Sequence, residues 1–383
     1  MSMKKIFLAI LFLTGCSVSD YQSIASIAVS KNPKSKIKHF LIRKRDYYLT
    51  HPQALAKDVK SFLYHFNLEV KEFTKAISIW QNPEKPTIKK LVKYSNHYRA
   101  RAIIDFDRGL VKVETIDKNY KKILQKALVN TMLMPDDPRS VDLFSDKIVL
   151  KGKPFLAGEI YDFEGKLVLY KWRANRYSSY LIRHNLKSYV YKNQKIYYVS
   201  FPLVKNSETL RAKKYLPFIR TYSKKYSISK SLILGIIKTE SDFNPYAISY
   251  VPAFGLMQIV PTTAGVEGYE RAYGYKHIPS KEFLFVPKNN IHIGTAYLNL
   301  LYYKYLSKIK NPLSREYMMI ASYNSGIGNV LRVFNIRKDR AVAIANLLSP
   351  NEVYYRLIHR LPTSEGRNYL PKVLKNRNKF IAL

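Results

Sequence analysis

The stretch that decides the fold spans residues 228–258 and reads ISKSLILGIIKTESDFNPYAISYVPAFGLMQ. Its first half predicts a helix, because Ile233, Ile236 and Ile237 recur at the spacing of one buried helical face. Ser229 stands directly before them and is the predicted N-cap, since its hydroxyl can accept a hydrogen bond from a backbone N–H of the first turn.

This helix carries one carboxyl group on its apolar face. Glu240 lies four residues after Ile236, on the same side of the helix. A carboxylate there is partly desolvated, which raises its pKa and suits a general acid that works near neutral pH. Pro245 disfavours helix in the residue before it, so the helix should end just past the acid. On periodicity alone, a solvated glutamate at a fraying helix end is the commoner outcome.

Three short blocks, in this order, resemble one enzyme family. They are Glu240-Ser241, Gly255-Leu256-Met257-Gln258 and Ala321-Ser322-Tyr323-Asn324-Ser325-Gly326. In order and spacing they resemble the lytic transglycosylases with a goose-lysozyme-like domain. The resemblance implies an all-α, lysozyme-like catalytic domain, which we expect over residues 206–383.

The resemblance also implies a reaction that one acid can perform. Glu240 would protonate the β-1,4 glycosidic oxygen between N-acetylmuramic acid and N-acetylglucosamine. The C6 hydroxyl of the same muramic acid would trap the oxocarbenium-like centre, and the carboxylate would accept its proton, which leaves a 1,6-anhydromuramoyl end. Ordinary glycosidases use two carboxyl groups. Asp242 is only two positions from Glu240, so a helix points it elsewhere, and no other acid after residue 220 lies in a comparable motif.

A set of substrate-binding residues follows from the same resemblance: Ser249, Gly255, Leu256, Met257, Gln258, Tyr323, Asn324 and Tyr369. Ser249 would help to hold the acetamido group of the substrate or the acid. Met257 and Gln258 would line the sugar subsites, and Tyr323 would form a hydrogen bond near Glu240. Tyr369, within the closing motif of residues 365–373, would flank the cleft, with plain packing as the alternative. Val251 stands where some relatives have a second serine.

The N-terminus predicts an anchor. Lys4-Lys5 precedes an apolar run from Ile6 to Leu13, which is too short to span a bilayer as a helix. Leu13-Thr14-Gly15-Cys16 resembles a bacterial lipobox, which implies cleavage of a signal peptide of residues 1–15 and acylation of Cys16, the only cysteine. Ser17 after it resembles the sorting signal for the outer membrane, on the periplasmic side. Residues 16–50 are polar and basic and predict a tether.

Residues 51–205 predict an α+β domain, so that the whole chain is α+β: a mixed α/β domain followed by an all-α domain. We expect helices from residue 56 to residue 80, from Tyr120 to Met134 and near Asn175–His184, and strands at Arg101–Phe106, Leu110–Ile116, Leu167–Trp172 and Lys195–Val204. Residues 90–94, 105–109, 136–138 and 141–143 resemble the N-terminal domain of membrane-bound lytic murein transglycosylases. Asp136-Asp137-Pro138 is more typical of a capped turn than of a metal site.

The rest of the chain predicts helices, with an interdomain helix at Glu208–Tyr226 and others at Thr262–Gly265, Asn289–Leu306 and Ser314–Tyr323. Asn324 to Gly328 holds two glycines and should open into a loop.

Composition narrows the partners. Across 383 residues the hydrophobic content of 47% excludes wholesale disorder, and 65 basic against 27 acidic side chains give a net charge of +38. This excess favours a polyanionic partner, either nucleic acid, anionic lipid or cell-wall polymer. No zinc-finger or basic-zipper pattern is visible, and an anchor outside the cytoplasm argues against nucleic acid. Peptidoglycan glycan strands and membrane lipid remain, with no metal or organic cofactor implied. A lysozyme-type muramidase and a non-catalytic wall-binding lipoprotein stay as alternatives.

Overall fold

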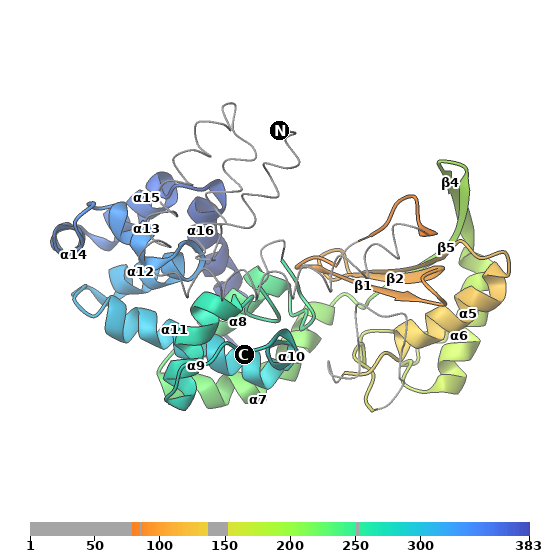
Figure 1. The fold of residues 1–383 in the computed structure, drawn as a ribbon. Coiled ribbons are helices and arrows are strands. Elements are labelled where there is room, and N and C mark those ends of the chain that lie inside the picture. The colour runs from red at the N-terminus through yellow and green to blue at the C-terminus, as the bar shows by residue number, and fades with distance from the viewer. Residues whose placement is uncertain (1–78, 85, 137–151, 250–252) are drawn as a thin grey trace.

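The computed structural model describes residues 79–84, 86–136, 152–249 and 253–383. Several predicted features lie outside these ranges: the signal peptide, Cys16, the tether, nearly all of the helix expected over residues 56–80, Asp137, Pro138, residues 141–143 and Val251. Within the described ranges no helix is long and apolar enough to cross a membrane. A domain with a sheet and a wholly helical domain lie side by side (Figure 1).

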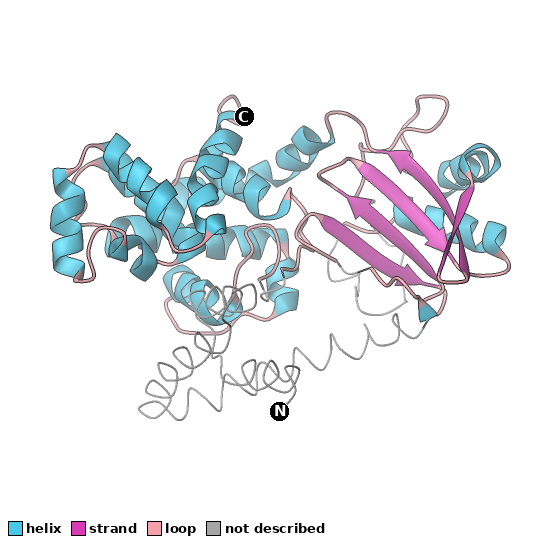
Figure 2. Ribbon diagram, turned by 90° about the horizontal axis from the view of Figure 1, so that it is seen from above, coloured by secondary structure: helices cyan, strands magenta, loops and turns pink. Residues whose placement is uncertain are grey.

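The first domain is built on an antiparallel five-stranded sheet (Figure 2). Its strand order is β1-β2-β3-β5-β4, with bounds Lys90–Ser95 for β1, Ala100–Asp105 for β2, Leu110–Thr115 for β3, Gln194–Pro202 for β5 and Lys187–Tyr191 for β4. Helices α5 (Tyr120–Met132) and α6 (Lys171–Asn185) cover one face of the sheet. Leu124, Leu128 and Met132 of α5 are fully buried, as the helical spacing predicted.

The predicted hairpin is confirmed. Strands β2 and β3 pair in antiparallel register with Asp105 opposite Leu110, and Gly109 takes the left-handed conformation at φ +59° that the tight turn needs. The predicted helix at Tyr120 and the strand near residues 195–204 are confirmed as α5 and β5.

The strand predicted at Leu167–Trp172 is wrong. Leu167 makes only an isolated bridge to Tyr161, and α6 already begins at Lys171. The reason lies in the residues that follow, because Ala174, Tyr177 and Leu181 recur at helical spacing and are buried. Strands β1 and β4 were not predicted. β4 is an exposed edge strand without apolar alternation.

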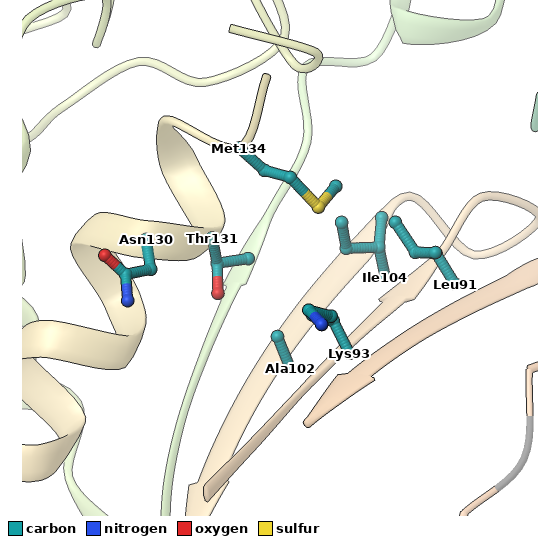
Figure 3. A pocket seen from close by; sticks show the side chains of 7 residues that line it. All are labelled: Leu91, Lys93, Ala102, Ile104, Asn130, Thr131 and Met134. Carbon is teal, nitrogen blue, oxygen red and sulfur yellow. The ribbon is translucent and has the colours of Figure 1, made fainter. Parts of the chain in front are cut away.

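A small cavity lies between α5 and strands β1 and β2 (Figure 3). It is lined by Leu91, Lys93, Ala102, Ile104, Asn130, Thr131 and Met134. Its volume is about 10 Å³, which is enough for one water molecule at most. This cavity is therefore a packing defect of the sheet domain, too small for a substrate.

The second domain is helical, as predicted. It contains α7 (Ser207–Tyr226), α8 (Lys230–Ser241), η2 (Pro261–Gly265), α9 (Val266–Tyr273), α10 (Lys281–Phe285), α11 (Pro287–Leu300), η3 (Leu301–Tyr305), α12 (Pro312–Ser325), α13 (Ile327–Arg332), α14 (Lys338–Leu347), α15 (Pro350–Arg360) and α16 (Ser364–Asn378). The π-helical turns η2 and η3 continue directly into or from an α-helix. One continuous apolar core runs through both domains, and Phe155 of the first domain packs edge-to-face on Tyr246 of the second at 5.5 Å.

A buried charge network also joins the domains. Arg211 of α7 donates from Nη1 to Glu159 of the first domain at 2.5 Å, and its Nη2 lies 3.9 Å from Asp242. Asp242 is the C-cap of α8 and accepts a hydrogen bond from Lys238 at 2.7 Å. All three members of the Glu159–Arg211–Asp242 chain are at most 3% exposed at the side chain. The end of α8 is therefore fixed to the sheet domain.

Replacing Arg211 by methionine should destabilise the protein by about 3–5 kcal/mol, because two buried carboxyl groups lose their shared cation. Urea denaturation followed by circular dichroism measures the loss. Arg220→Met, on the exposed side of the same helix, is the matched control and should change the free energy of unfolding little. Equal stability of the two variants would contradict the role given to Arg211.

Candidate active site

Helix α8 carries Glu240 in its last turn, two residues before Asp242, which joins the charge network between the domains. Ile233, Ile236 and Ile237 are fully buried, as predicted. Ser229 directly precedes the helix, but its predicted capping bond is wrong, because its hydroxyl pairs with that of Ser231 at 2.9 Å. The helix ends at Ser241, just past the acid, because Asp242 adopts a left-handed conformation with φ +53°. This stop comes three residues before Pro245.

The carboxyl group of Glu240 has an unusual pKa. The side chain is half-buried, and desolvation raises its pKa from 4.5 to about 7. A hydrogen bond from Tyr369 opposes this rise, the charge of Glu365 adds to it, and the charge of Lys372 lowers it. At neutral pH the group is therefore divided between its acid and its carboxylate forms, which a residue that must give and then take a proton requires.

Two tyrosines lie beside Glu240. The hydroxyl of Tyr369 donates to Glu240 Oε1 at 2.6 Å. The hydroxyl of Tyr323 donates to the backbone oxygen of Met257 at 2.8 Å, close enough to Glu240 for the carboxylate charge to raise the pKa of Tyr323 further above the level set by burial. The sequence had Tyr323 as the hydrogen-bonding partner near the acid and Tyr369 at the edge of the cleft. The structure gives the direct bond to Tyr369.

Close contact of two helices brings Tyr369 to the acid. Helix α16 carries Tyr369 and runs against α8 at Gly235, where an added Cβ would lie 2.8 Å from the backbone nitrogen of Arg377. One turn away, Asn376 Nδ2 donates to Thr239 Oγ1 at 2.9 Å. Only a glycine permits this spacing, so Gly235 sets the distance between the acid and its hydrogen-bond donor.

The GLMQ block forms a tight loop beside the end of α8. Gly255 has φ +77°, which side-chain-bearing residues rarely adopt. Leu256 and Met257 are fully buried, so the prediction that the Met257 side chain lines the sugar subsites is wrong, and Leu256 likewise packs inward. Gln258 is 9% exposed and donates to the backbone oxygens of Ala247 and Gly255. The side chains of Leu256, Met257 and Gln258 therefore pack inward, which leaves mainly the backbone of the block to face a substrate.

Asn290 of α11 holds this loop and was missed by sequence reasoning. Its Oδ1 accepts from the backbone N–H of Met257 at 2.7 Å, and its Nδ2 donates to the oxygens of Phe254 and Leu284. Ser241, next to the acid, donates to the oxygen of Leu256 at 2.7 Å. No signal in the sequence indicated this role, because the burial of Asn290 is seen only in the structure.

The remaining predicted residues lie around this centre. Ser249 accepts from the backbone N–H of Ala253 at 3.2 Å, so its hydroxyl closes the base of the loop. Asn324 donates from Nδ2 to Glu365 Oε1 at 3.1 Å. Glu365 is exposed and close enough to Glu240 to raise the pKa of that carboxyl group. Sequence reasoning missed Glu365 as a site residue, although it begins the same closing motif as Tyr369.

Asp242 points away from this centre, as predicted, into the buried contact with Lys238 and Arg211. Within the part of the chain that the structure describes, no three His, Cys, Asp or Glu side chains gather in the way a metal site requires. The arrangement offers one acid with a pKa near neutrality, one tyrosine donor and one neighbouring exposed carboxylate.

The chain matches two family models, described as "Membrane-bound lytic murein transglycosylase C, N-terminal domain" over residues 55–214 and "Transglycosylase SLT domain" over residues 217–346. It is 45% identical over 288 residues to membrane-bound lytic murein transglycosylase C of Klebsiella pneumoniae (strain 342), which covers 74% of this chain and 80% of the relative. The protein of that name from Serratia proteamaculans (strain 568) is 44% identical over the same length.

Two solved structures are similar to part of the chain. They are the 70 kDa soluble lytic transglycosylase of Escherichia coli, with 27% identity and a TM-score of 0.33 over 43% of this chain and 23% of that one, and an inactive mutant of lytic transglycosylase Slt from Pseudomonas aeruginosa, with 27% identity and a TM-score of 0.32 over 42% and 23%. The assignment to a family rests on the family models and on the relatives that are similar in sequence. The matched transglycosylase domain and the relatives define the class of this protein as a lytic transglycosylase. The chain belongs to the membrane-bound lytic murein transglycosylase C family.

Replacing Tyr369 by phenylalanine should move the pH dependence of kcat/KM. The tyrosine hydrogen bond stabilises the carboxylate, so its loss should raise the pKa of Glu240. Activity that needs the protonated acid falls as pH rises through that pKa, and the falling limb should shift to higher pH in the variant. Tyr323→Phe is the matched control, because its hydroxyl binds Met257 and not the acid. An unshifted limb in Tyr369→Phe would contradict this prediction.

Proposed function

We propose that Glu240 is both the acid and the base of this enzyme. The chain is a peptidoglycan lytic transglycosylase that cleaves the bond between N-acetylmuramic acid and N-acetylglucosamine. The observation that supports the assignment of Glu240 is its half-buried carboxyl group, whose pKa is raised to about 7 beside the Tyr369 hydroxyl.

The carboxyl group of Glu240 donates a proton in the first step and accepts one in the second. Protonated Glu240 gives its proton to the glycosidic oxygen, and the bond from that oxygen to C1 of the muramic acid breaks. The C6 hydroxyl of the same sugar attacks C1, and the Glu240 carboxylate takes the proton that this hydroxyl loses. The products are an anhydromuramoyl end and a free 4-hydroxyl, with no water consumed. The Tyr369 hydroxyl supports the carboxylate stage of this cycle, because a hydrogen bond to the charged form stabilises it.

The substrate-binding roles divide between side chains and backbone. The side chains of Ser249, Tyr323 and Asn324 are proposed to position the sugars around the acid, whereas that of Gln258 is bonded within its own loop and is proposed to hold the loop backbone toward them. Leu256 and Met257 are buried, so we infer that they support the loop and that the substrate meets its backbone, with Gly255 providing the turn.

Glu365 favours one alternative. It is a second carboxylate near the acid and could activate water as a base, which would give the hydrolytic chemistry of a lysozyme-type muramidase. Two features count against this role. Glu365 is exposed, and Asn324 already donates to its Oε1. The products of the two reactions differ by one water.

Digestion of purified peptidoglycan followed by mass spectrometry of the products should give anhydro ends. Glu240→Gln should lower kcat/KM by about 10²–10⁴-fold, because the side chain can no longer transfer a proton. Glu365→Gln should still give anhydro products, and Glu282→Gln, a solvent-exposed acid on α10, serves as the matched control. Reducing ends that disappear in Glu365→Gln would identify a hydrolase and contradict the proposal.

The family indicates that the enzyme is associated with a membrane, but it does not say which membrane or how the chain is attached. The chain is membrane-associated, as its relatives are named. We infer that Cys16 carries the lipid and holds the protein at the outer membrane, facing the periplasm. In this arrangement residues 16–50 are the tether, residues 51–205 form the first domain and residues 206–383 the catalytic domain. Several acyl chains on Cys16 would hold the protein stably at the membrane, since each buried CH₂ contributes about 0.8 kcal/mol.

Replacing Cys16 by alanine should release the protein from the membrane. Fractionation of cells by density separation, with detection of the chain, should find the variant in the soluble periplasmic fraction and the unaltered protein with the outer membrane. Ser17→Asp tests the sorting signal and should move the protein to the inner membrane. Membrane attachment that survives Cys16→Ala would contradict the lipid anchor.

A further inference from the structure

One face of α6 carries a row of exposed rings and charges. Trp172, Arg176, Tyr180 and His184 lie four residues apart, so they follow one another along the helix, and all four are exposed. Trp172 is 56% exposed. The opposite face of α6 is buried through Ala174, Tyr177, Ser178 and Leu181. We call the exposed row, together with Phe163 and Tyr170 of the preceding loop, the aromatic ridge.

The ridge is built from paired rings and guanidinium groups. Phe163 stacks on Tyr180 with ring centroids 4.4 Å apart and planes inclined by 17°. Arg176 lies over the Phe163 ring at 5.1 Å, and Arg173 lies over Trp172 at 4.4 Å. Such contacts fix the rings in place before any partner arrives.

The loop before α6 is held by one buried carboxylate. Asp162 accepts from the backbone N–H groups of Glu164 at 3.0 Å and Lys166 at 2.9 Å, and from Arg173 at 2.5 Å. These bonds also lower the pKa of Asp162, so the carboxylate stays charged well below neutral pH. The ridge is therefore a preformed surface, and binding to it costs little ordering.

The ridge lies far from the acid. Figure 1 shows α6 on the outer side of the sheet domain, whereas α8 and α16 belong to the helical domain. Exposed rings that lie next to one another, as Phe163 and Tyr180 do, are typical of an interaction surface, whereas single scattered rings are not. A contact made here cannot belong to the sugar subsites around Glu240.

The chemistry of the ridge fits the substrate of this enzyme. Ring faces of Trp and Tyr pack against the apolar faces of sugars, and exposed arginines pair with carboxylates. A peptidoglycan strand offers both, as a row of sugars with carboxylates on its peptide stems. Lys166 and Lys171 are exposed here, whereas Asp162 is buried and bonded to Arg173, and Glu164 is paired with Arg176. The accessible charge is therefore positive, opposite to that of the stems.

We propose that the aromatic ridge is a second peptidoglycan-binding site, which holds one part of a glycan strand while another part lies at Glu240. The proposal rests on the peptidoglycan activity given above. An enzyme that holds a polymer at two linked sites stays bound to it for longer, without any change at the bond that reacts. An anionic membrane surface is the rival partner, because aromatic and basic residues also gather at membrane interfaces. The ridge favours the strand, since charged groups stand between its rings and prevent their insertion into the lipid.

The test measures retention of the full chain on purified insoluble peptidoglycan. All variants carry Glu240→Gln so that the wall is not digested. Trp172→Ala with Tyr180→Ala should weaken binding about tenfold or more, as loss of one of two linked contacts does. The control pair is Tyr303→Ala with Tyr355→Ala, which are 48% and 60% exposed on the catalytic domain and should bind as the parent does. Trp172→Phe with Tyr180→Phe keeps the rings and should restore most of the binding.

Two further measurements separate the possible failures. With Glu240 intact, the alanine pair should cleave a short soluble muropeptide as fast as the parent, and its binding to vesicles with anionic lipid should not change. Undiminished wall binding, a loss confined to vesicles, or lost cleavage of the short substrate would each overturn the proposal. A wrong assignment of Glu240 would appear separately, as release of products by the Glu240→Gln parent.

Discussion

The hydrogen bond from Tyr369 to Glu240 is the interaction on which the active site depends. Burial alone would push the acid toward its neutral form, and the tyrosine hydroxyl, 2.6 Å away, draws it back. The resulting pKa of about 7 suits both halves of the reaction, because an acid held much higher would be a poor proton donor and one held much lower would rarely be protonated. The opposing effects act at one carboxyl group, so one residue can serve twice.

This balance requires rigid support, and three small contacts provide it. Gly235 lets α16 approach α8 so closely that Tyr369 reaches the acid from the neighbouring helix. Asn376 binds Thr239 one turn from that point. Asn290 holds the loop of residues 254–257 in place from α11. None of these groups touches the reacting atoms. Their effect is to hold the donor and the loop within hydrogen-bonding distance of their partners.

The sequence predicts most of the helices well, and it predicts that Glu240 lies at the end of its helix, because these signals are local. The apolar spacing around Ile236 and the turn at Gly109 each lie within a few residues. Which tyrosine binds Glu240 could not be predicted, since Tyr369 is 129 positions away and the contact arises from the packing of two helices. The burial of Met257 could not be predicted either, because it also depends on another helix. The Met257 side chain packs against Gly294 of α11, and its backbone N–H donates to Asn290 of the same helix. The strand predicted at Leu167–Trp172 was wrong because the helical spacing of the residues that follow starts α6 at Lys171.

The sheet domain supports the helix that carries the acid. Its Glu159 shares Arg211 with Asp242, the residue that ends the helix of the acid, and the two domains share one apolar core. The geometry of α8 is therefore set partly from outside its own domain. The same packing fixes the distance between the aromatic ridge and Glu240, because α6 and α8 both bury side chains in one continuous core. A glycan strand bound at the ridge would meet the acid at a defined spacing, which a flexible linker between domains could not provide.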